Sequence, residues 1–287
     1  MKRILVTGGN GQLGSSLKKI AGENDLFVWT FIDYPDLDLT DRKAVNDYFA
    51  GHLTDYIINC AAFTAVDEAE KRPNDAFGVN ARVPETLGIL CQEKDMRMIH
   101  ISTDYIYNGD SCIPHKEEEI PAPESVYGQS KLAGEMALRN NSRAIIIRTS
   151  WLYSEYGQNF LKTMLRLGNE RKEIGVVYDQ TGTPTYAGDL ARALVTVIQF
   201  CETRTFQPGV YNYSNEGVCS WYDFAWETMK VTNTPCTIRP ILTHEYPLPA
   251  KRPPYSVLDK ALIKNTFGIA IPHWKESLHF VTGILKK

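Results

Sequence analysis

Tyr127 and Lys131 stand four positions apart in the stretch VYGQSKLAG, which predicts a helix. Residues at i and i+4 of a helix share one face, so the phenol and the ammonium are expected to be neighbours. A free phenol titrates near pH ~10, too high for efficient proton exchange at neutral pH. A nearby ammonium stabilises the phenolate and lowers the pKa of the phenol, so the pair predicts a proton donor. Because a chain with 15 tyrosines holds about one such pair by chance, other features must support this hypothesis.

A hydroxyl pair, Ser102 and Thr103, supplies one such feature. Thr103 ends an apolar stretch, residues 96–103, and lies 24 residues before Tyr127. A doubly wound sheet brings the end of a strand and the start of the next helix to the same edge. The Thr103 hydroxyl is therefore expected beside the phenol of Tyr127.

A glycine-rich loop follows the first apolar stretch, residues 3–7, and opens a helix. Gly8 suits a tight turn, Gly11 allows a pyrophosphate to approach the backbone, and Gly14 allows close packing of helix on strand. The helix N-terminus also offers free N–H groups and positive partial charge to phosphates. With a strand before it and a helix after it, the loop predicts dinucleotide binding rather than a structural turn.

The choice between NADPH and NADH stays open. An acid at the end of the second strand would hold a ribose 2′-hydroxyl, and Asp33 and Asp38 are the candidates, although each could instead serve a turn or a helix cap. No arginine follows that strand to bind a 2′-phosphate, which favours NADH. Backbone and hydroxyl groups could still accommodate NADPH.

The elements that must position these residues alternate regularly. Continuous apolar runs are typical of parallel strands buried on both faces. They occupy residues 3–7, 26–32, 56–62, 96–103 and 143–150. The helical stretches cover about 41–51, 74–94 and 126–140, with a kink expected at Pro84. This alternation predicts an α/β fold with a doubly wound, Rossmann-like parallel sheet.

The rhythm changes after residue 150. We expect residues 1–150, completed by parts of 176–200, to form the dinucleotide-binding domain, and 151–287 to form mainly a smaller C-terminal substrate lobe. Ser220 and Asp223 read as a capping pair before a helix. The proline-rich stretch 239–259 must be extended, and whether it is a lid stays open.

Composition excludes several classes of function. A net charge of −3 gives no support to a nucleic-acid or anionic-membrane partner. No apolar run approaches the roughly 20 residues that span a bilayer, and the N-terminus lacks the features of a signal peptide. Six scattered cysteines without metal-ligand spacing predict reduced thiols, no metal site and a cytoplasmic location.

The motifs together resemble the extended short-chain dehydrogenase/reductases, and more specifically the dTDP-4-dehydrorhamnose reductase family. The matching blocks include NGQLG, NCAAFTAVDEAE, STDYIY, VYGQSKLAGE, RTSWLY, DQTGTPT and RPPYSVLD. They run from residue 4 to about 260 in the family's order. The later blocks are much more specific than the glycine loop.

The resemblance implies reduction of the C4 ketone of dTDP-4-dehydro-6-deoxy-L-mannose to dTDP-L-rhamnose by hydride transfer from NADPH or NADH. Tyr127 would donate the proton, Lys131 would reach the nicotinamide ribose, and Thr103 would orient the ketone. The implied cofactor-binding residues are Gly8, Gly11, Gln12, Leu13, Asp38, Leu39, Ala62, Phe63, Thr64, Ile101, Tyr127 and Lys131. The implied substrate-binding residues are Thr103, Asp104, Trp151 and Arg252. Without the resemblance, Trp151 could equally be a buried aromatic and Arg252 a solvated charge.

Some features depart from the family or leave alternatives. Members described as magnesium-bridged dimers use a glutamate on the first helix, where this chain has Ser16, so a bound Mg²⁺ is not expected and a homodimer stays open. One alternative is another nucleotide-sugar reductase or epimerase. A dehydratase would carry an acidic pair after Thr103, where this chain has Asp104 and Tyr105. A second alternative is a non-catalytic, NADP-binding regulatory subunit like that of methionine adenosyltransferase.

Overall fold

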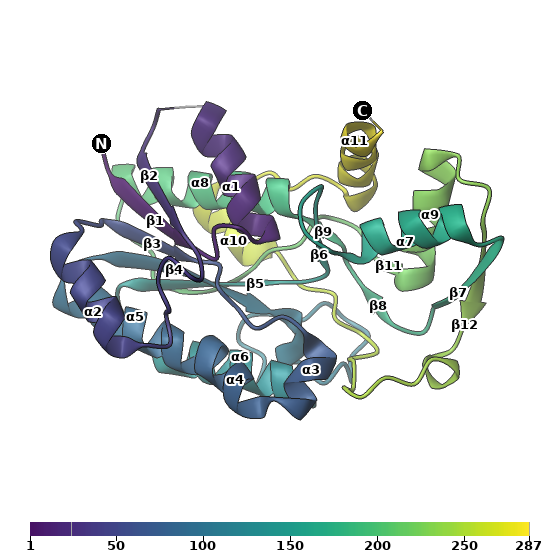
Figure 1. Cartoon of the computed structure of the whole chain (residues 1–287), viewed down its shortest axis with the longest axis horizontal. Coiled ribbons are helices and arrows are strands. Elements are labelled where there is room, and N and C mark those ends of the chain that lie inside the picture. Colours follow the sequence, from purple (N-terminus) through teal and green to yellow (C-terminus); the bar gives the residue numbers. More distant parts are fainter. Residues whose placement is uncertain (24, 287) are drawn as a thin grey trace.

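Six parallel strands form the central sheet of the computed structural model, which describes residues 1–23 and 25–286 (Figure 1). Their order is β10-β5-β4-β3-β1-β2. The bounds are β1 (Arg3–Thr7), β2 (Val28–Ile32), β3 (Tyr56–Asn59), β4 (Arg97–Thr103), β5 (Ala144–Thr149) and β10 (Gly209–Asn212). The order reverses beside β1, which creates the crevice where such sheets bind ligands. The predicted doubly wound sheet is confirmed.

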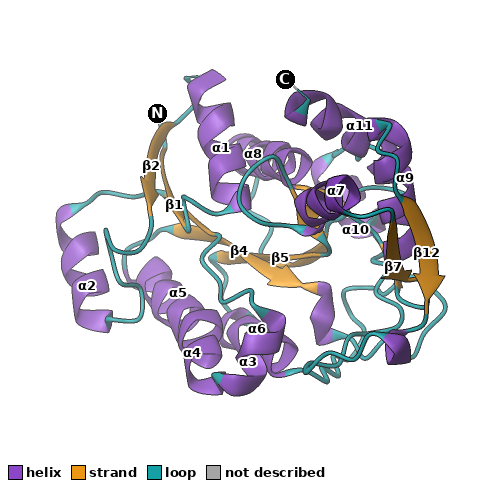
Figure 2. Ribbon diagram, turned by 45° about the vertical axis from the view of Figure 1, so that its right-hand side comes forward, coloured by secondary structure: helices purple, strands orange, loops and turns teal. Residues whose placement is uncertain are grey.

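Helices cover both faces of this sheet (Figures 1 and 2). One face carries α1 (Gln12–Glu23), α8 (Ala187–Thr203) and α10 (Ala261–Phe267), and the other carries α2 (Arg42–Gly51), α5 (Val83–Glu93) and α6 (Val126–Leu138). Apolar side chains from both layers meet the strands, as Leu17 does on one face and Leu87 on the other. The edge strand β2 differs from the expected continuous burial. Its residues alternate in exposure, because an edge strand is covered less completely.

A π-helical turn stands where the sequence predicted a kink. The stretch 74–94 consists of α4 (Pro73–Phe77), the π-helical turn η1 (Gly78–Arg82) and α5. Pro84 has no N–H to donate to the carbonyl of Asn80, so the regular helical ladder is interrupted there. Helix α6 packs closely at this point, since a Cβ on Gly134 would lie 2.2 Å from the Asn80 carbonyl oxygen.

The second lobe lies beside the sheet, on the right of Figure 1. Its helices are α7 (Phe160–Glu170), α9 (Trp221–Thr232) and α11 (Trp274–Leu285). Its short strands are β6 (Leu152–Tyr153), β7 (Glu173–Val177), β8 (Thr181–Gly182), β9 (Thr185–Tyr186), β11 (Cys219–Ser220) and β12 (Thr237–Ile241). Phe224, Trp274 and Leu278 contribute to a separate apolar core. The predicted capping box of Ser220 and Asp223 opens α9.

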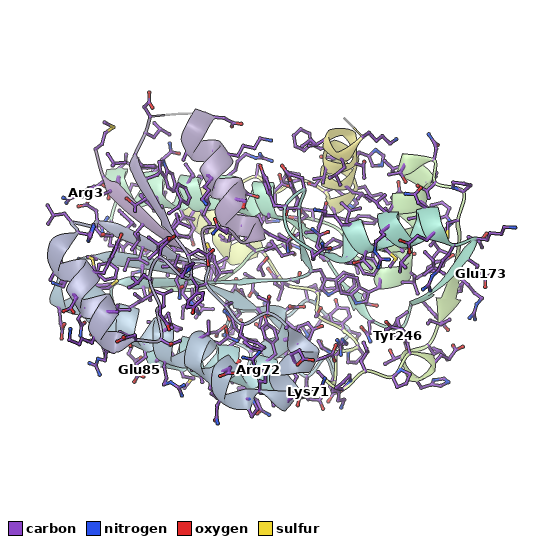
Figure 3. The ribbon with its side chains drawn as sticks, in the orientation of Figure 1. Arg3, Lys71, Arg72, Glu85, Glu173 and Tyr246 are labelled. Atoms are coloured by element: carbon purple, nitrogen blue, oxygen red, sulfur yellow. The ribbon has the colours of Figure 1, made fainter. Side chains whose placement is uncertain are left out.

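The stretch 239–259 is extended and ordered, as predicted from its prolines. After the 3-10 turn η3 (Thr243–Glu245) it runs back past α3 (Val66–Lys71). Figure 3 labels Tyr246 on this stretch and Lys71 at the C-terminal end of α3, and the stretch meets α3 at Asp67, near the start of the helix. Backbone hydrogen bonds from His115 to Val257 and from Thr181 to Pro254, both 2.8 Å long, attach it to the two lobes.

Two further features bear on function. Within residues 1–23 and 25–286, no helix combines the length and the apolarity needed to cross a bilayer. Within the same ranges, no three His, Cys, Asp or Glu side chains gather closely enough to hold a metal ion.

A buried ion pair fastens α6 to β5. The Nη2 atom of Arg148 lies 2.8 Å from Oε2 of Glu135, and both side chains are 4% exposed. Arg148 also donates to the Tyr107 hydroxyl at 2.7 Å, and Ser102 donates to Glu135. Because these bonds satisfy both charges, the pair can fix the position of α6 along β5, and so relative to the ends of the strands.

Glu135→Gln should lower the free energy of unfolding by about 3 kcal/mol, because it leaves the buried guanidinium of Arg148 without a counter-charge. Urea unfolding followed by circular dichroism measures this. The matched control is Glu170→Gln, which breaks an exposed pair with Arg166 and should cost less than about 1 kcal/mol. Equal losses in the two variants would contradict a structural role for the buried pair.

Candidate active site

A cavity of about 940 Å³ opens at the carboxyl ends of the parallel strands. This is within the usual range for small-molecule sites, roughly 300–1,000 Å³. The predicted site residues that line it are Gly8, Gly11, Gln12, Leu13, Asp38, Leu39, Ala62, Thr64, Ile101, Thr103, Asp104, Tyr127, Lys131 and Trp151. Phe63 and Arg252 are outside this lining. The fold thus brings residues from five strand ends to one space.

The glycine loop is shaped by close backbone contacts. Gly8 has φ +63°, and a Cβ there would lie 2.8 Å from the amide nitrogen of Ala61. A Cβ on Gly14 would lie 2.3 Å from the carbonyl oxygen of Gly8. Only glycine therefore lets α1 begin this close to β1, with its N-terminus at the cavity. A diphosphate fits this arrangement, because free N–H groups and the helix dipole face the space.

The two acids after β2 are both hydrogen-bonded to nearby backbone. Asp33 accepts from the amide of Asn10, at 2.7 Å, and from the amide of Tyr34, at 2.8 Å. Asp38 accepts from the amide and the hydroxyl of Thr40, and these bonds lower the pKa of Asp38. Asp33 therefore anchors the glycine loop, and both acids place negative charge at the cavity wall.

Tyr127 and Lys131 lie on the first two turns of α6. Ser125 caps this helix by accepting from the amide of Gly128 at 3.1 Å. A Cβ on Gly128 would lie 2.3 Å from the carbonyl oxygen of Tyr105, so glycine allows the helix to start against the end of β4. The phenol of Tyr127 is consequently close enough to Thr103 for a hydrogen bond between their side chains.

The expected lowering of the Tyr127 pKa is wrong for this structure. Burial raises the pKa of Tyr127 to about 12, a hydrogen bond with Thr103 lowers it, and the charge of Asp104 raises it. The Nζ of Lys131 donates to the carbonyl oxygen of Ile101 at 2.6 Å. Burial also lowers the pKa of Lys131 to about 8. The phenol therefore holds its proton throughout the neutral range.

Asp104 is a buried acid next to the reactive hydroxyls. It is 1% exposed, and its Oδ1 accepts from the Thr103 hydroxyl at 3.0 Å. Burial raises the pKa of Asp104 to about 6, and hydrogen bonds from Ser256 and Thr103 oppose the rise. Because stability alone would not favour a buried carboxylate, its position indicates a functional role.

Arg252 and Phe63 are held by protein partners. Arg252 makes a bidentate pair with Asp67, with Nη1 to Oδ1 at 2.9 Å and Nη2 to Oδ2 at 2.6 Å. The backbone of Phe63 exchanges two hydrogen bonds with the side chain of Asn80, at 2.8 and 3.0 Å. Their predicted contacts with a ligand therefore stay predictions.

Two contributions were missed by sequence reasoning. The side chain of Gln12 turns toward the second lobe: Ser154 and Asn159 donate to its Oε1, both at 3.0 Å. Trp221 lines the cavity from α9. Asn159 gave one signal, because asparagine is a preferred residue at the N-terminus of a helix and here it caps α7. The sequence could not show the contacts of Gln12 or the place of Trp221 at the cavity, because each brings together residues that are far apart in the chain.

Comparison with known proteins decides the family. Residues 1–285 match the family described as RmlD substrate binding domain. A dTDP-4-dehydrorhamnose reductase from Aggregatibacter actinomycetemcomitans is 39% identical over 286 residues, which cover 97% of each chain. This chain belongs to the dTDP-4-dehydrorhamnose reductase family. The resemblance seen in the sequence is confirmed.

Solved structures of the dTDP-4-dehydrorhamnose reductase family agree with this placement. The protein from Clostridium acetobutylicum superposes with a TM-score of 0.94 at 39% identity, covering 99% of this chain and 100% of that one. The protein from Bacillus anthracis, solved in complex with NADP, gives a TM-score of 0.92 at 37% identity and full coverage of both. The fold is therefore shared with a relative that was solved with NADP bound.

Gly14→Ala should raise the dissociation constant for NADPH and NADH at least about tenfold, because the new methyl group must push α1 away from the loop. Nicotinamide fluorescence titration measures this. Gly22→Ala on the same helix meets no atom within 4 Å and should leave both constants unchanged. If Gly14→Ala binds as tightly as Gly22→Ala, the loop does not hold the dinucleotide.

The free energy of unfolding of Asp104→Asn, taken relative to that of the wild type, should be about 1 kcal/mol higher at about pH 7.5 than at about pH 5. The pKa of Asp104 is raised on folding, so the folded state binds the extra proton and the wild type loses stability as pH rises through about 6. Asparagine does not titrate and lacks this loss. Urea unfolding of both proteins at the two pH values measures the difference, and an equal effect at both would contradict it.

Proposed function

We propose that this chain reduces the C4 ketone of dTDP-4-dehydro-6-deoxy-L-mannose, forming dTDP-L-rhamnose, with NADPH or NADH as reductant. The main observation in support is that Thr103, Tyr127 and Trp151 line one cavity. A glycine loop of the dinucleotide-binding type lines the same cavity. Family membership supports the substrate class. A relative from Streptomyces niveus, 35% identical, is named dTDP-4-keto-6-deoxy-D-glucose reductase, again a reductase of a dTDP-linked 4-keto sugar.

In this proposal the two parts of the chain divide the ligands. Residues 1–150, with parts of 176–200, hold the dinucleotide, and 151–287 hold mainly the nucleotide sugar. Asp38, Leu39, Ala62 and Thr64 border the dinucleotide along the crevice beside β1. The carboxylates of Asp33 and Asp38 disfavour a 2′-phosphate, whereas the Bacillus anthracis relative binds NADP, so both reductants belong in the assay. When bound, the reduced nicotinamide supplies the hydride.

Tyr127 donates the proton in the proposed reaction. Hydride addition at C4 leaves negative charge on the sugar oxygen, and an alkoxide is a stronger base than a phenolate. Transfer of the proton from Tyr127 is therefore favourable even with its pKa raised to about 12. Thr103 must turn its hydroxyl from Asp104 toward the ketone oxygen to orient it.

Lys131 acts by position. Its Nζ carries three protons when charged, and the bond to the Ile101 carbonyl uses one of them. The others remain for the ribose hydroxyls of the dinucleotide. Because the pKa of Lys131 is lowered to about 8, the ammonium persists at neutral pH and is lost in mildly alkaline solution.

Tyr127→Phe should keep dinucleotide binding and reduce turnover by about 10²-fold or more, the usual contribution of a general acid. The assay follows oxidation of NADPH and of NADH with dTDP-4-dehydro-6-deoxy-L-mannose, with and without EDTA. Tyr246→Phe, an exposed tyrosine on the proline-rich stretch, is the control and should have wild-type turnover. Full activity in Tyr127→Phe would remove this residue from the mechanism.

The same assay separates the alternatives. An epimerase would convert its substrate without net consumption of reduced nicotinamide. A regulatory subunit would bind the dinucleotide and oxidise none of it. Either outcome with the wild-type chain would overturn the proposed reaction.

A further inference from the structure

Trp151 has an unusual backbone conformation at the edge of the cavity. Its φ is +46°, a left-handed value that bulky residues rarely adopt. Such a conformation persists where the surrounding structure enforces it, and it is concentrated at functional sites. Hydrogen bonds fix the turn on both sides: the Ser150 hydroxyl donates to the Thr183 carbonyl at 2.7 Å, and the Thr185 amide donates to the Trp151 carbonyl at 3.2 Å.

The indole of Trp151 is stacked on the indole of Trp221. The ring centroids are 3.6 Å apart and the planes differ by 10°. Gly182 also lies against the Trp151 ring, since a Cβ there would be 2.7 Å from two of its atoms. Phe160 supports the Trp221 ring, with centroids 4.6 Å apart. The Trp151 side chain is therefore confined by groups that all belong to the second lobe.

Trp221 is itself rigidly placed. It is the first residue of α9, directly after the capping box of Ser220 and Asp223. Helix α9 packs against α7 and α11, which carry the apolar core of the lobe. The position of the Trp221 ring is thus set by the lobe and does not depend on the loops around it.

The paired indoles lie on the sugar side of the cavity. Thr149 pairs with Thr103 across β5 and β4, so Trp151, two residues further on, projects from the strand end beside the ketone-binding hydroxyl. The glycine loop follows β1, which β4 and β3 separate from β5. Both indoles line the cavity. They offer it an aromatic face, which packs well against the C–H groups of a deoxy sugar.

We propose that Trp221 is a positioning residue for the sugar: by stacking on Trp151 it fixes an apolar wall for the C–H face and the C6 methyl group of a 6-deoxy-4-keto sugar. This inference rests on the proposed reductase function. It adds a residue of the second lobe to the substrate site. Trp221 acts through Trp151, and the hydride and proton transfers do not need it.

Trp221→Leu should raise the KM for the nucleotide sugar about tenfold, equivalent to ~1.4 kcal/mol. The kcat and the KM for the reductant should stay within about twofold of wild type, because the lost interaction is made equally in ground and transition states. Trp221→Phe keeps an aromatic ring and should recover most of the loss. Trp226→Leu, on the same helix but 44% exposed, is the matched control and should match the wild type.

A spectroscopic readout tests the same point without turnover. Stacked indoles give an exciton couplet in far-ultraviolet circular dichroism, which Trp221→Phe should abolish and Trp226→Phe should keep. Saturating dTDP-L-rhamnose should change the wild-type couplet, whereas the dinucleotide alone should not. This measurement also covers the case in which Trp221→Leu does not fold.

The outcomes separate the two hypotheses. A wild-type chain that neither reduces the ketone nor binds dTDP-L-rhamnose would overturn the proposed function. An active wild type whose couplet does not change with dTDP-L-rhamnose, with Trp221→Leu and Trp226→Leu equal in KM, would overturn the role of Trp221 alone. A fall in kcat without a rise in KM would also contradict a positioning role.

Discussion

The parallel pairing of β4 with β5 is the constraint on which the candidate site depends. Thr103 lies opposite Thr149, at the last position of both strands, and neighbouring strands are about 4.8 Å apart. The hydroxyl of Thr103 and the turn of Trp151 must therefore be adjacent. The buried pair of Glu135 and Arg148 fastens α6 to β5, which brings Tyr127 to the same point. A slip of β5 by one residue against β4 would turn the side chains of β5, including Arg148, to the opposite face.

Burial sets the electrostatic state of this point. It raises the pKa of Tyr127 and of Asp104 and lowers that of Lys131, so each group is shifted toward its neutral form. A site of this kind responds strongly to a new charge, because little water is present to screen it. Negative charge on a reduced ketone oxygen would lie near the hydroxyls of Tyr127 and Thr103, which both line the cavity.

Local patterns allowed the sheet, the glycine loop and the candidate catalytic residues to be placed from the sequence. Each depends on residues close together in the chain or on the common edge of parallel strands. The direction of the Lys131 side chain could not be predicted. It depends on a hydrogen bond from Nζ to the carbonyl of Ile101, 30 residues earlier in the chain. Likewise, no local pattern could show that β10 extends the central sheet beside β5, because the two strands are far apart in the chain. The stacking of Trp221 on Trp151 joins residues 70 positions apart, beyond the reach of any periodic pattern.

Polar contacts join the two lobes at the cavity rim. Gln12 of the glycine loop accepts hydrogen bonds from Ser154 and Asn159, and Asp67 holds Arg252. Polar groups at a cavity rim can exchange one partner for another at small net cost, because water and ligand atoms offer similar hydrogen bonds. The apolar core around Phe224 keeps the second lobe rigid during such exchanges. A ligand that competes for these rim groups would therefore alter how the lobes meet without disturbing either core.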